Sequence, residues 1–356
     1  MRPPDASAVA GPLAPLLATA GVTDVLVNGA GRVWVDGPTG LVRVAVAGLD
    51  TEEQVRALAV RLAAAGGRRL DDASPWVDAR LPDGTRLHAV LPVLCRGGTH
   101  VSLRVPSGPS LDLAGLVAAG AVSPGLSVAL AQVVAERRGL LVTGATGAGK
   151  TTLLGALLGL VPASERLVVV EDAAELAPRH PHVVSLEARP GNVEGAGSVG
   201  LDVLVRQALR MRPDRLVVGE CRGAEVRELL LAMGAGHAGA ATLHAARPEQ
   251  VPVRVVALAG SAGIDPATAL LQLRSAVEVV VPVVRGADGR RLVAGIWGWS
   301  DPGGAGPGSV QRSGSASQAG VAPAAAFGAS PTLVQLVDAD GGRGRGGRHL
   351  ARARAA

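Results

Sequence analysis

The stretch LVTGATGAGKTTLL, residues 141–154, contains Lys150, which is the only lysine among the 35 basic residues of the chain. Residues 144–151, GATGAGKT, match the pattern G-x-x-x-x-G-K-[ST] of a phosphate-binding loop. An apolar strand pattern precedes the match and the helical pattern TTLLGALLGL follows it, which is the context that the motif requires. The stretch therefore predicts a strand, a loop that binds nucleotide phosphates, and a helix.

The side chains of the motif suit this chemistry. A lysine ammonium is compact and carries three donors, whereas the guanidinium of arginine is planar and wider, so arginine does not fit between the outer phosphates. Glycines let backbone N–H groups converge on phosphate oxygens at the helix N-terminus. A chance match is the alternative, at roughly one in several hundred for this composition. The predicted nucleotide contacts are Gly144, Ala145, Thr146, Gly147, Ala148, Gly149, Lys150, Thr151 and Thr152, and the Thr151 hydroxyl is a predicted Mg²⁺ ligand.

The hydrophobic pattern divides the chain into two domains. Residues 22–47 and 79–104 alternate as antiparallel strands do, and between them Thr51 and Gln54 open a capped amphipathic helix. From residue 126 onward, short apolar strands alternate with helices, which indicates a buried, mostly parallel sheet. The sequence thus predicts a smaller α+β domain over 1–105, a linker over 106–125, an α/β domain over 126–300 and a low-complexity basic tail without regular structure over 301–356.

Composition narrows the function classes. Residues 341–356 hold five arginines and no acid, and without them 30 basic residues balance the 30 acidic residues. The near-neutral body does not predict a large nucleic-acid-binding face. The tail is expected to be solvated, with contact to RNA, DNA or anionic lipid as the alternative. Two distant cysteines, no signal-peptide pattern and no run of 18 apolar residues predict a reduced, cytoplasmic protein.

Acidic residues follow two further apolar strands. Glu171 and Asp172 end RLVVVED, with Glu175 one helical step later, and Glu220 ends DRLVVGE. Ligands of open α/β sheets lie outside the carboxyl ends of the strands, so these carboxylates are expected beside the phosphate loop. Gly219 occupies the position where an aspartate is usual. We therefore predict that Glu171 and Asp172 hold Mg²⁺ and take part in catalysis, and that Glu220 activates water, with solvated strand-end acids as the alternative.

Two histidines lie in GAGHAGAATLHA. His244 ends a strand pattern beside the proposed site, where an imidazole can bond to the outer phosphate and respond to its loss. His237 is a second candidate for nucleotide contact, and a structural role is the alternative for both. Their spacing of seven and the lack of a cysteine partner do not fit zinc.

The chain resembles the secretion and pilus ATPase superfamily in the order of four sequence blocks. These are the phosphate loop (144–151), the acidic block (171–175), the VGE block (218–220) and the histidine block (237–244). LVRQALRMRPDRLVVGECRGAE and VTDVLVNGAGRVWV are similar to its tight-adherence (Tad) branch. The resemblance implies a RecA-like ATPase domain and a cytoplasmic, hexameric ring that hydrolyses ATP with Mg²⁺ and works with inner-membrane platform proteins. It also implies that Arg80, Arg86 and Arg104 close over the phosphates, with Arg210 and Arg212 as further candidates for phosphate or subunit contacts.

The chain departs from the family pattern in its histidine block. The two histidines stand one residue closer than in many Tad-type members, and Ala246 replaces a common asparagine. The four-cysteine zinc module of type II secretion ATPases is absent from the sequence. A RecA-like DNA motor, an ATP-binding scaffold with little turnover and, more weakly, a small-molecule kinase remain alternative functions.

Overall fold

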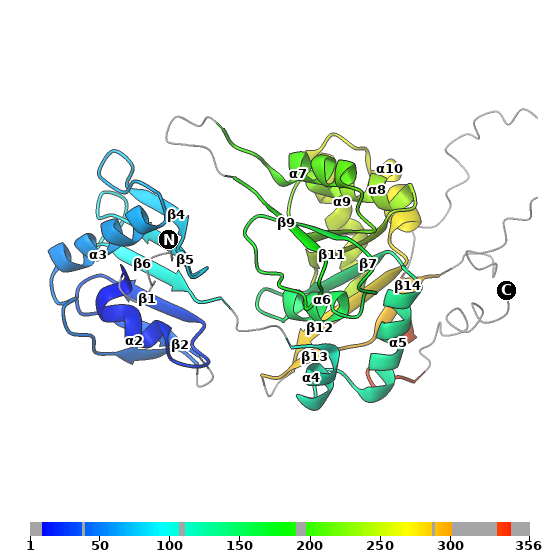
Figure 1. The fold of residues 1–356 in the computed structure, drawn as a ribbon, viewed down its shortest axis with the longest axis horizontal. Helices are drawn as coiled ribbons and strands as arrows, with labels where there is room; N and C mark the ends of the chain where they lie inside the picture. Colours follow the sequence, from blue (N-terminus) through cyan, green and yellow to red (C-terminus); the bar gives the residue numbers. More distant parts are fainter. Residues whose placement is uncertain are drawn as a thin grey trace, which may run out of the picture. The chain divides into compact units, whose positions relative to one another are not determined.

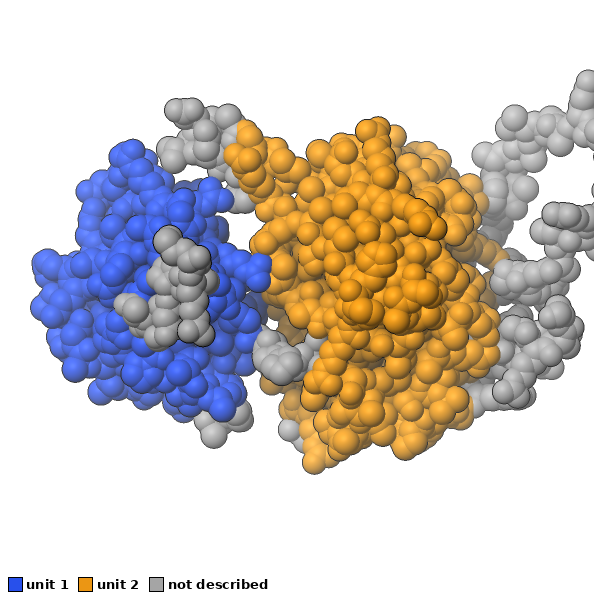
Figure 2. Space-filling view, in the orientation of Figure 1, with its two compact units in different colours: residues 1–108 blue, residues 109–356 orange. Residues whose placement is uncertain are grey.

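The computed structural model describes residues 9–37, 40–106, 111–189, 197–286, 289–300 and 333–342. The chain divides into two compact units, Met1–Gly108 and Pro109–Ala356, which Figure 2 shows in blue and orange. No helix within the described ranges is long and apolar enough to cross a membrane.

The first unit is an antiparallel sheet with the strand order β3-β2-β1-β6-β5-β4 and a helix, α3, packed against it (Figure 1). Helix α3 begins with the capping box predicted at Thr51 and Gln54, where each side chain bonds to the other residue's backbone. Val55, Leu58 and Leu62 of α3 are buried against the inward strand residues. The elements are β1 (Asp24–Asn28), β2 (Val33–Asp36), β3 (Val42–Val44), β4 (Trp76–Arg80), β5 (Arg86–Val90), β6 (His100–Arg104), η1 (Gly11–Leu13), α2 (Ala14–Leu17) and α3 (Glu52–Ala65).

The second unit is built on a larger sheet with the order β15-β14-β12-β7-β11-β10-β8-β9, to which β13 adds beside β12. The pairs from β12 to β9 are parallel, whereas β13, β14 and β15 pair antiparallel, so the predicted mostly parallel sheet is confirmed. The strands are β7 (Leu140–Gly144), β8 (Leu167–Glu171), β9 (Val183–Glu187), β10 (Arg215–Cys221), β11 (Ala238–His244), β12 (Val279–Arg285), β13 (Arg291–Val293), β14 (Ile296–Trp299) and β15 (Leu333–Val337).

Helices cover both faces of this sheet, which explains the uninterrupted apolar strands. Val217 packs in the core with α4, α5 and α6, and its neighbour Val218 packs in the core with α7 to α10. Successive strand side chains point to opposite faces, so every central position must be apolar. The helices, on two sides in Figure 1, are α4 (Leu113–Ala118), α5 (Pro124–Ala135), α6 (Lys150–Leu158), α7 (Leu201–Ala208), η2 (Leu209–Met211), α8 (Glu225–Gly234), η3 (Pro248–Gln250), α9 (Val251–Ser261) and α10 (Pro266–Ala276).

The structure differs from the predicted boundaries at two places. The predicted linker, 106–125, includes helix α4 and joins the second unit, because Leu113 and Leu116 are buried in its core. The predicted tail, 301–356, includes strand β15, which pairs antiparallel with β14 and buries Leu333 and Val337. The Gly-, Ala- and Ser-rich composition of the long segment conceals this short strand, which is stabilised by pairing with β14 and by burial of its apolar side chains. The basic residues of the tail, from Arg343 onward, lie outside the described residues.

Candidate nucleotide-binding site

The phosphate loop connects the end of β7 to the start of α6, as predicted. Gly147 has a φ of +72°, and a Cβ added there would meet no atom within 4 Å, so the middle of the loop faces open space. At the ends of the loop, a Cβ on Gly144 would lie 2.4 Å from the Val283 carbonyl oxygen, and one on Gly149 would lie 3.2 Å from Arg291 Cδ. The open centre fits a phosphate, close packing against the β12 backbone requires glycine at 144, and a φ of +100° favours glycine at 149.

Lys150 is held at this loop by several contacts. Its Nζ donates to the carbonyl oxygens of Gly144 (3.3 Å) and Ala145 (3.1 Å) and to His244 Nδ1 (3.1 Å). Its side chain is 6% exposed, and its Nζ lies 3.7 Å from Glu220 Oε1. Burial lowers the pKa of Lys150, and the nearby Glu220 carboxylate acts in the opposite direction. The ammonium is therefore held at the loop, and the Glu220 carboxylate balances its charge only in part.

His244 connects the lysine to Glu220. His244 Nε2 lies 2.7 Å from Glu220 Oε1, so this nitrogen donates to the carboxylate while Nδ1 accepts from Lys150. Burial and the Lys150 charge lower the pKa of His244, and Glu220 partly offsets them, which favours the neutral imidazole at pH 7. Parallel strands β10 and β11 bring the two side chains together at their carboxyl ends.

Glu171 has a different environment from the one that its sequence position predicts. It is 4% exposed, and its Oε1 accepts the backbone N–H groups of Glu175 (3.1 Å) and Leu176 (3.0 Å). These bonds anchor the loop over 172–176, so we assign Glu171 to that structural role rather than to the predicted catalysis or metal binding. Asp172 is half-exposed on this loop, and Glu175 is one of the charges that act on the pKa of Lys150. Asp172 stays the predicted magnesium ligand.

The glycine at position 219 has a steric reason. A Cβ added there would lie 2.5 Å from Glu171 Cγ and 2.8 Å from Glu171 Oε1. Glu171 of β8 thus fills the space in which a side chain at 219 would begin. Thr242 of β11 donates its hydroxyl to the Gly219 carbonyl oxygen at 2.7 Å, which further fixes this part of β10.

Arg222 is a site residue that the sequence reasoning missed. Its guanidinium pairs with Glu220, and its Nη1 lies 3.9 Å from Asp172 Oδ2. Buried Glu225 accepts the backbone N–H groups of Arg222 and of Gly223, the latter at 2.7 Å, and so holds the turn after Glu220. The sequence held one signal for this contact, because Arg222 stands only two positions after Glu220. The neighbouring Cys221 is buried, which strongly raises the pKa of its thiol.

The prediction for His237 is corrected by the fold. His237 precedes the first residue of β11, and its Nδ1 contacts the Ala232 carbonyl oxygen at 3.2 Å. His244 ends the same strand, so the two histidines lie at opposite edges of the sheet, about 20 Å apart. Arg210 and Arg212 precede β10 and likewise lie at the edge opposite the phosphate loop. A phosphate contact in the same chain is thereby ruled out for these three residues.

Three arginines of the first unit form a row. Arg80 pairs in register with Arg86 across β4 and β5, and Arg86 pairs with Arg104 across β5 and β6. Their side chains share one face of the sheet at the ends of these strands. Arg104 Nε lies 3.6 Å from Asp24 Oδ1. The register thus concentrates positive charge at residues that are distant in the sequence.

The residues at the loop fit a nucleotide with Mg²⁺. Thr151 follows Lys150 on α6, and Asp172 follows the last residue of β8, which β11 and β10 separate from β7; both side chains carry the oxygen atoms that Mg²⁺ prefers as ligands. No group of three or more His, Cys, Asp or Glu side chains suited to a protein-only metal site occurs in the described part of the chain.

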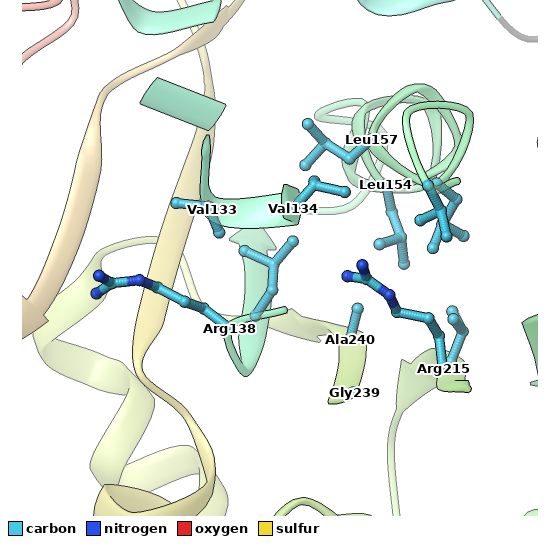
Figure 3. A pocket seen from close by; sticks show the side chains of 12 residues that line it. Val133, Val134, Arg138, Leu154, Leu157, Arg215, Gly239 and Ala240 are labelled. Atoms are coloured by element: carbon cyan, nitrogen blue, oxygen red, sulfur yellow. The ribbon is translucent and has the colours of Figure 1, made fainter. Parts of the chain in front are cut away.

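An apolar pocket lies at the other edge of the sheet and is separate from this site (Figure 3). Leu154 and Leu157 of α6 and Val133 and Val134 of α5 line it. Leu140, Arg215 and Gly239, at the starts of β7, β10 and β11, also line it, together with Arg138, Leu158, Val161, Val217 and Ala240. These strand starts are opposite the ends that carry Gly144, Glu220 and His244, so the pocket is not part of the phosphate loop.

A comparison with protein families gives a match to the type II/IV secretion system protein family over residues 6–292. The chain belongs to this family. It is 54% identical over 294 residues to a putative conjugal transfer protein of Mycobacterium tuberculosis, covering 81% of this chain and 83% of the relative. It is 32% identical over 316 residues to the type IV secretion system protein PtlH of Bordetella pertussis, covering 80% of this chain and 92% of PtlH.

Solved structures of a pilus retraction motor and of an ATPase share the fold of this family member. The pilus retraction motor PilT with bound ADP aligns with a TM-score of 0.56 and 19% identity, over 77% of this chain and 78% of PilT. The ATPase DotB of Legionella pneumophila aligns with a TM-score of 0.54 and 19% identity, over 77% and 75% of the two chains. The predicted α/β fold with a smaller preceding domain is thereby confirmed.

Proposed function

We propose that the protein is an ATPase that binds ATP and Mg²⁺ at the phosphate loop and hydrolyses ATP to drive a pilus, secretion or conjugal transfer apparatus of the Tad type. The observation that carries the proposal is the linked group of Lys150, His244 and Glu220 beside the open centre of the loop. Family membership and the conjugal transfer and type IV secretion relatives support the pathway class.

The chemistry follows from the side chains in place. Lys150 leaves its two carbonyl partners and His244 to bind the outer phosphates, because phosphate oxygens are stronger acceptors for an ammonium. Thr151 and Asp172 hold Mg²⁺, which when bound neutralises phosphate charge. Glu220 orients the attacking water and accepts its proton as the bond between the β- and γ-phosphates breaks, giving ADP and phosphate.

His244 couples this step to the loop. In the structure it donates to Glu220 and accepts from Lys150, so its Nδ1 loses a partner when Lys150 turns toward a phosphate. The single N–H of the neutral imidazole can donate to the outer phosphate once it leaves Glu220 or the proton moves to Nδ1, and that bond is lost after hydrolysis. We assign His244 the role of reporting whether the outer phosphate is present.

The proposal extends to assembly. We infer a hexameric ring at the cytoplasmic face of the inner membrane, in contact with platform proteins of the apparatus. The row of Arg80, Arg86 and Arg104 suits a role in closing over the phosphates, because guanidinium groups bind phosphate oxygens and the register brings three of them to one face of the sheet. The near-neutral body gives no support to a nucleic-acid substrate.

Mg²⁺-dependent ATPase measurements on the purified full chain test the proposal. The Lys150→Ala and Glu220→Gln variants are expected to lose about a hundredfold or more in turnover, because each removes a group that acts on the transferring phosphate. Arg254→Gln, an exposed change on α9, is the control and should match the wild type. A wild-type rate no higher than that of Lys150→Ala would refute the proposal, and tight ATP binding without turnover would favour a scaffold.

A further inference from the structure

The β12–β13 hairpin lies against the phosphate loop on the side away from the catalytic groups. In the sheet, β7 has β12 on one side and β11 on the other, with β10 and β8 beyond β11. His244 and Glu220 come from β11 and β10, so they approach the loop from that side. When the outer phosphate of a bound nucleotide lies beside Lys150, His244 and Glu220, its nucleoside end lies on the side of β12 and β13.

Contacts between the hairpin and the loop are close. The Val283 carbonyl oxygen of β12 would lie 2.4 Å from a Cβ at Gly144, and Arg291 of β13 packs across Gly149. Arg291 Cδ would lie 3.2 Å and Arg291 Cβ 4.0 Å from a Cβ at Gly149. The aliphatic stem of Arg291 therefore runs along the residue that precedes Lys150, and its guanidinium begins one bond beyond the Cδ that touches the loop.

The charge of Arg291 is not neutralised by the described residues. The Arg291 side chain is exposed and has no hydrogen-bond or ion-pair partner among them. It stands directly opposite Arg285 in the register of the hairpin, and like charges in such a pair repel. Arg285 Nε donates to the Gly289 carbonyl oxygen at 3.1 Å, which keeps that side chain on the hairpin. An anion at the loop would relieve the repulsion and give the Arg291 guanidinium a partner.

We propose that Arg291 is a nucleotide-binding residue whose guanidinium contacts the phosphate nearest the nucleoside, the α-phosphate, of a nucleotide on the loop. This inference rests on the proposed nucleotide binding and adds a residue from a strand that the sequence motifs do not include. Arg291 acts from the same chain as the loop, on the side opposite Glu220 and His244. The nucleotide is thus held from both sides of β7.

Calorimetric titration of the full-length protein with MgADP tests the role of Arg291, because ADP keeps the α-phosphate and is not hydrolysed. Arg291→Met keeps an aliphatic stem over Gly149 and removes the charge, so it is expected to weaken ADP binding about tenfold. Arg291→Lys keeps the charge and should stay within about threefold of the wild type. Arg254→Met on α9 is the matched control and should bind as the wild type does.

Salt dependence separates a charge contact from packing on the loop. The wild-type affinity for ADP should fall more steeply between low and high salt than that of Arg291→Met, because the variant has one fewer charge contact to screen. Three results would each overturn the inference. The first is an ADP affinity of Arg291→Met within twofold of the wild type, and the second is the same salt dependence in both proteins. The third is an ADP affinity of Arg291→Lys as weak as that of Arg291→Met. If the wild type itself fails to bind ADP, the proposed function fails; if it binds and Arg291→Met binds equally, only the inference about Arg291 fails.

Discussion

The contact between Gly219 and Glu171 predicts a large effect for a small substitution, Gly219→Ala. Gly219 does not have a positive φ, so alanine fits the backbone and the only obstacle is steric. The new methyl group would lie 2.5 Å from Glu171 Cγ and 3.0 Å from Glu171 Cδ. Glu171 is buried and bonded to the N–H groups of Glu175 and Leu176, so it cannot move aside without losing those bonds.

The magnitude follows from these contacts. The site either keeps Glu171 in place and accepts the extra carbon, at a cost of about 1–3 kcal/mol, or loses a hydrogen bond to the charged group, at a cost of about 1.5–3 kcal/mol. A destabilisation of about 2 kcal/mol lowers the Tm of a domain of this size by about 4–8 °C. Displacement of the 172–176 loop, which carries Asp172, should also lower ATP turnover about 10- to 100-fold. The affinity for ADP should change little, since the phosphate loop lies on β7 and α6.

Thermal unfolding, ADP titration and turnover are measured on Gly219→Ala beside Gly239→Ala. A Cβ at Gly239 would lie 2.5 Å from Met233 Cγ, a clash of the same size against a flexible side chain at the far edge of the sheet. Gly239→Ala should therefore cost less stability and leave turnover unchanged. In the double variant Gly219→Ala/Glu171→Ala the clash is absent, so a coupling energy of about 0.5–3 kcal/mol is expected. Normal turnover and an unchanged Tm in Gly219→Ala would refute the assignment of Glu171 as the anchor of the loop.

Three further predictions follow from other parts of the structure. Lys150→Arg should lose about a hundredfold in ATP turnover, as Lys150→Ala does, because the 6% exposed site between Ala145 and His244 has no room for a guanidinium; near-normal turnover would contradict this. The pKa of His244 is lowered in the folded protein, so near the ordinary histidine pKa of about 6.5 the unfolded chain binds more protons than the folded protein. The nucleotide-free protein should therefore lose stability as the pH falls through that region. Melting curves at pH 5 to 8 should show a weaker pH dependence for His244→Gln, and an equal dependence would contradict the shift. A chain ended at residue 332 should be about 3–6 kcal/mol less stable to denaturant than one ended at 342, because it lacks the buried Leu333 and Val337 of β15; equal stability would show that β15 is dispensable.

The phosphate loop, the capped helix α3 and the parallel sheet could be predicted from the sequence because each depends on neighbouring residues. Glycine spacing around Lys150, the Thr51 and Gln54 cap and the apolar strand runs are all local patterns. The pairing of Glu220 with His244 was also within reach, since both end strands of the same sheet. Patterns of this kind say which residues arrive at one edge of a sheet, but not which way each side chain turns.

The sequence by itself thus determined the nucleotide loop, the two-domain order and the strand ends at which acids and His244 gather. Only the tertiary structure decided that Glu171 turns inward to hold the 172–176 loop, that His237 lies at the opposite edge, and that Arg291 crosses Gly149. Each of these depends on steric and hydrogen-bond contacts between segments far apart in the chain, as between Glu171 and Gly219. Periodicity and motif spacing do not predict such contacts, because the contacts form only when separate strands and loops pack against each other.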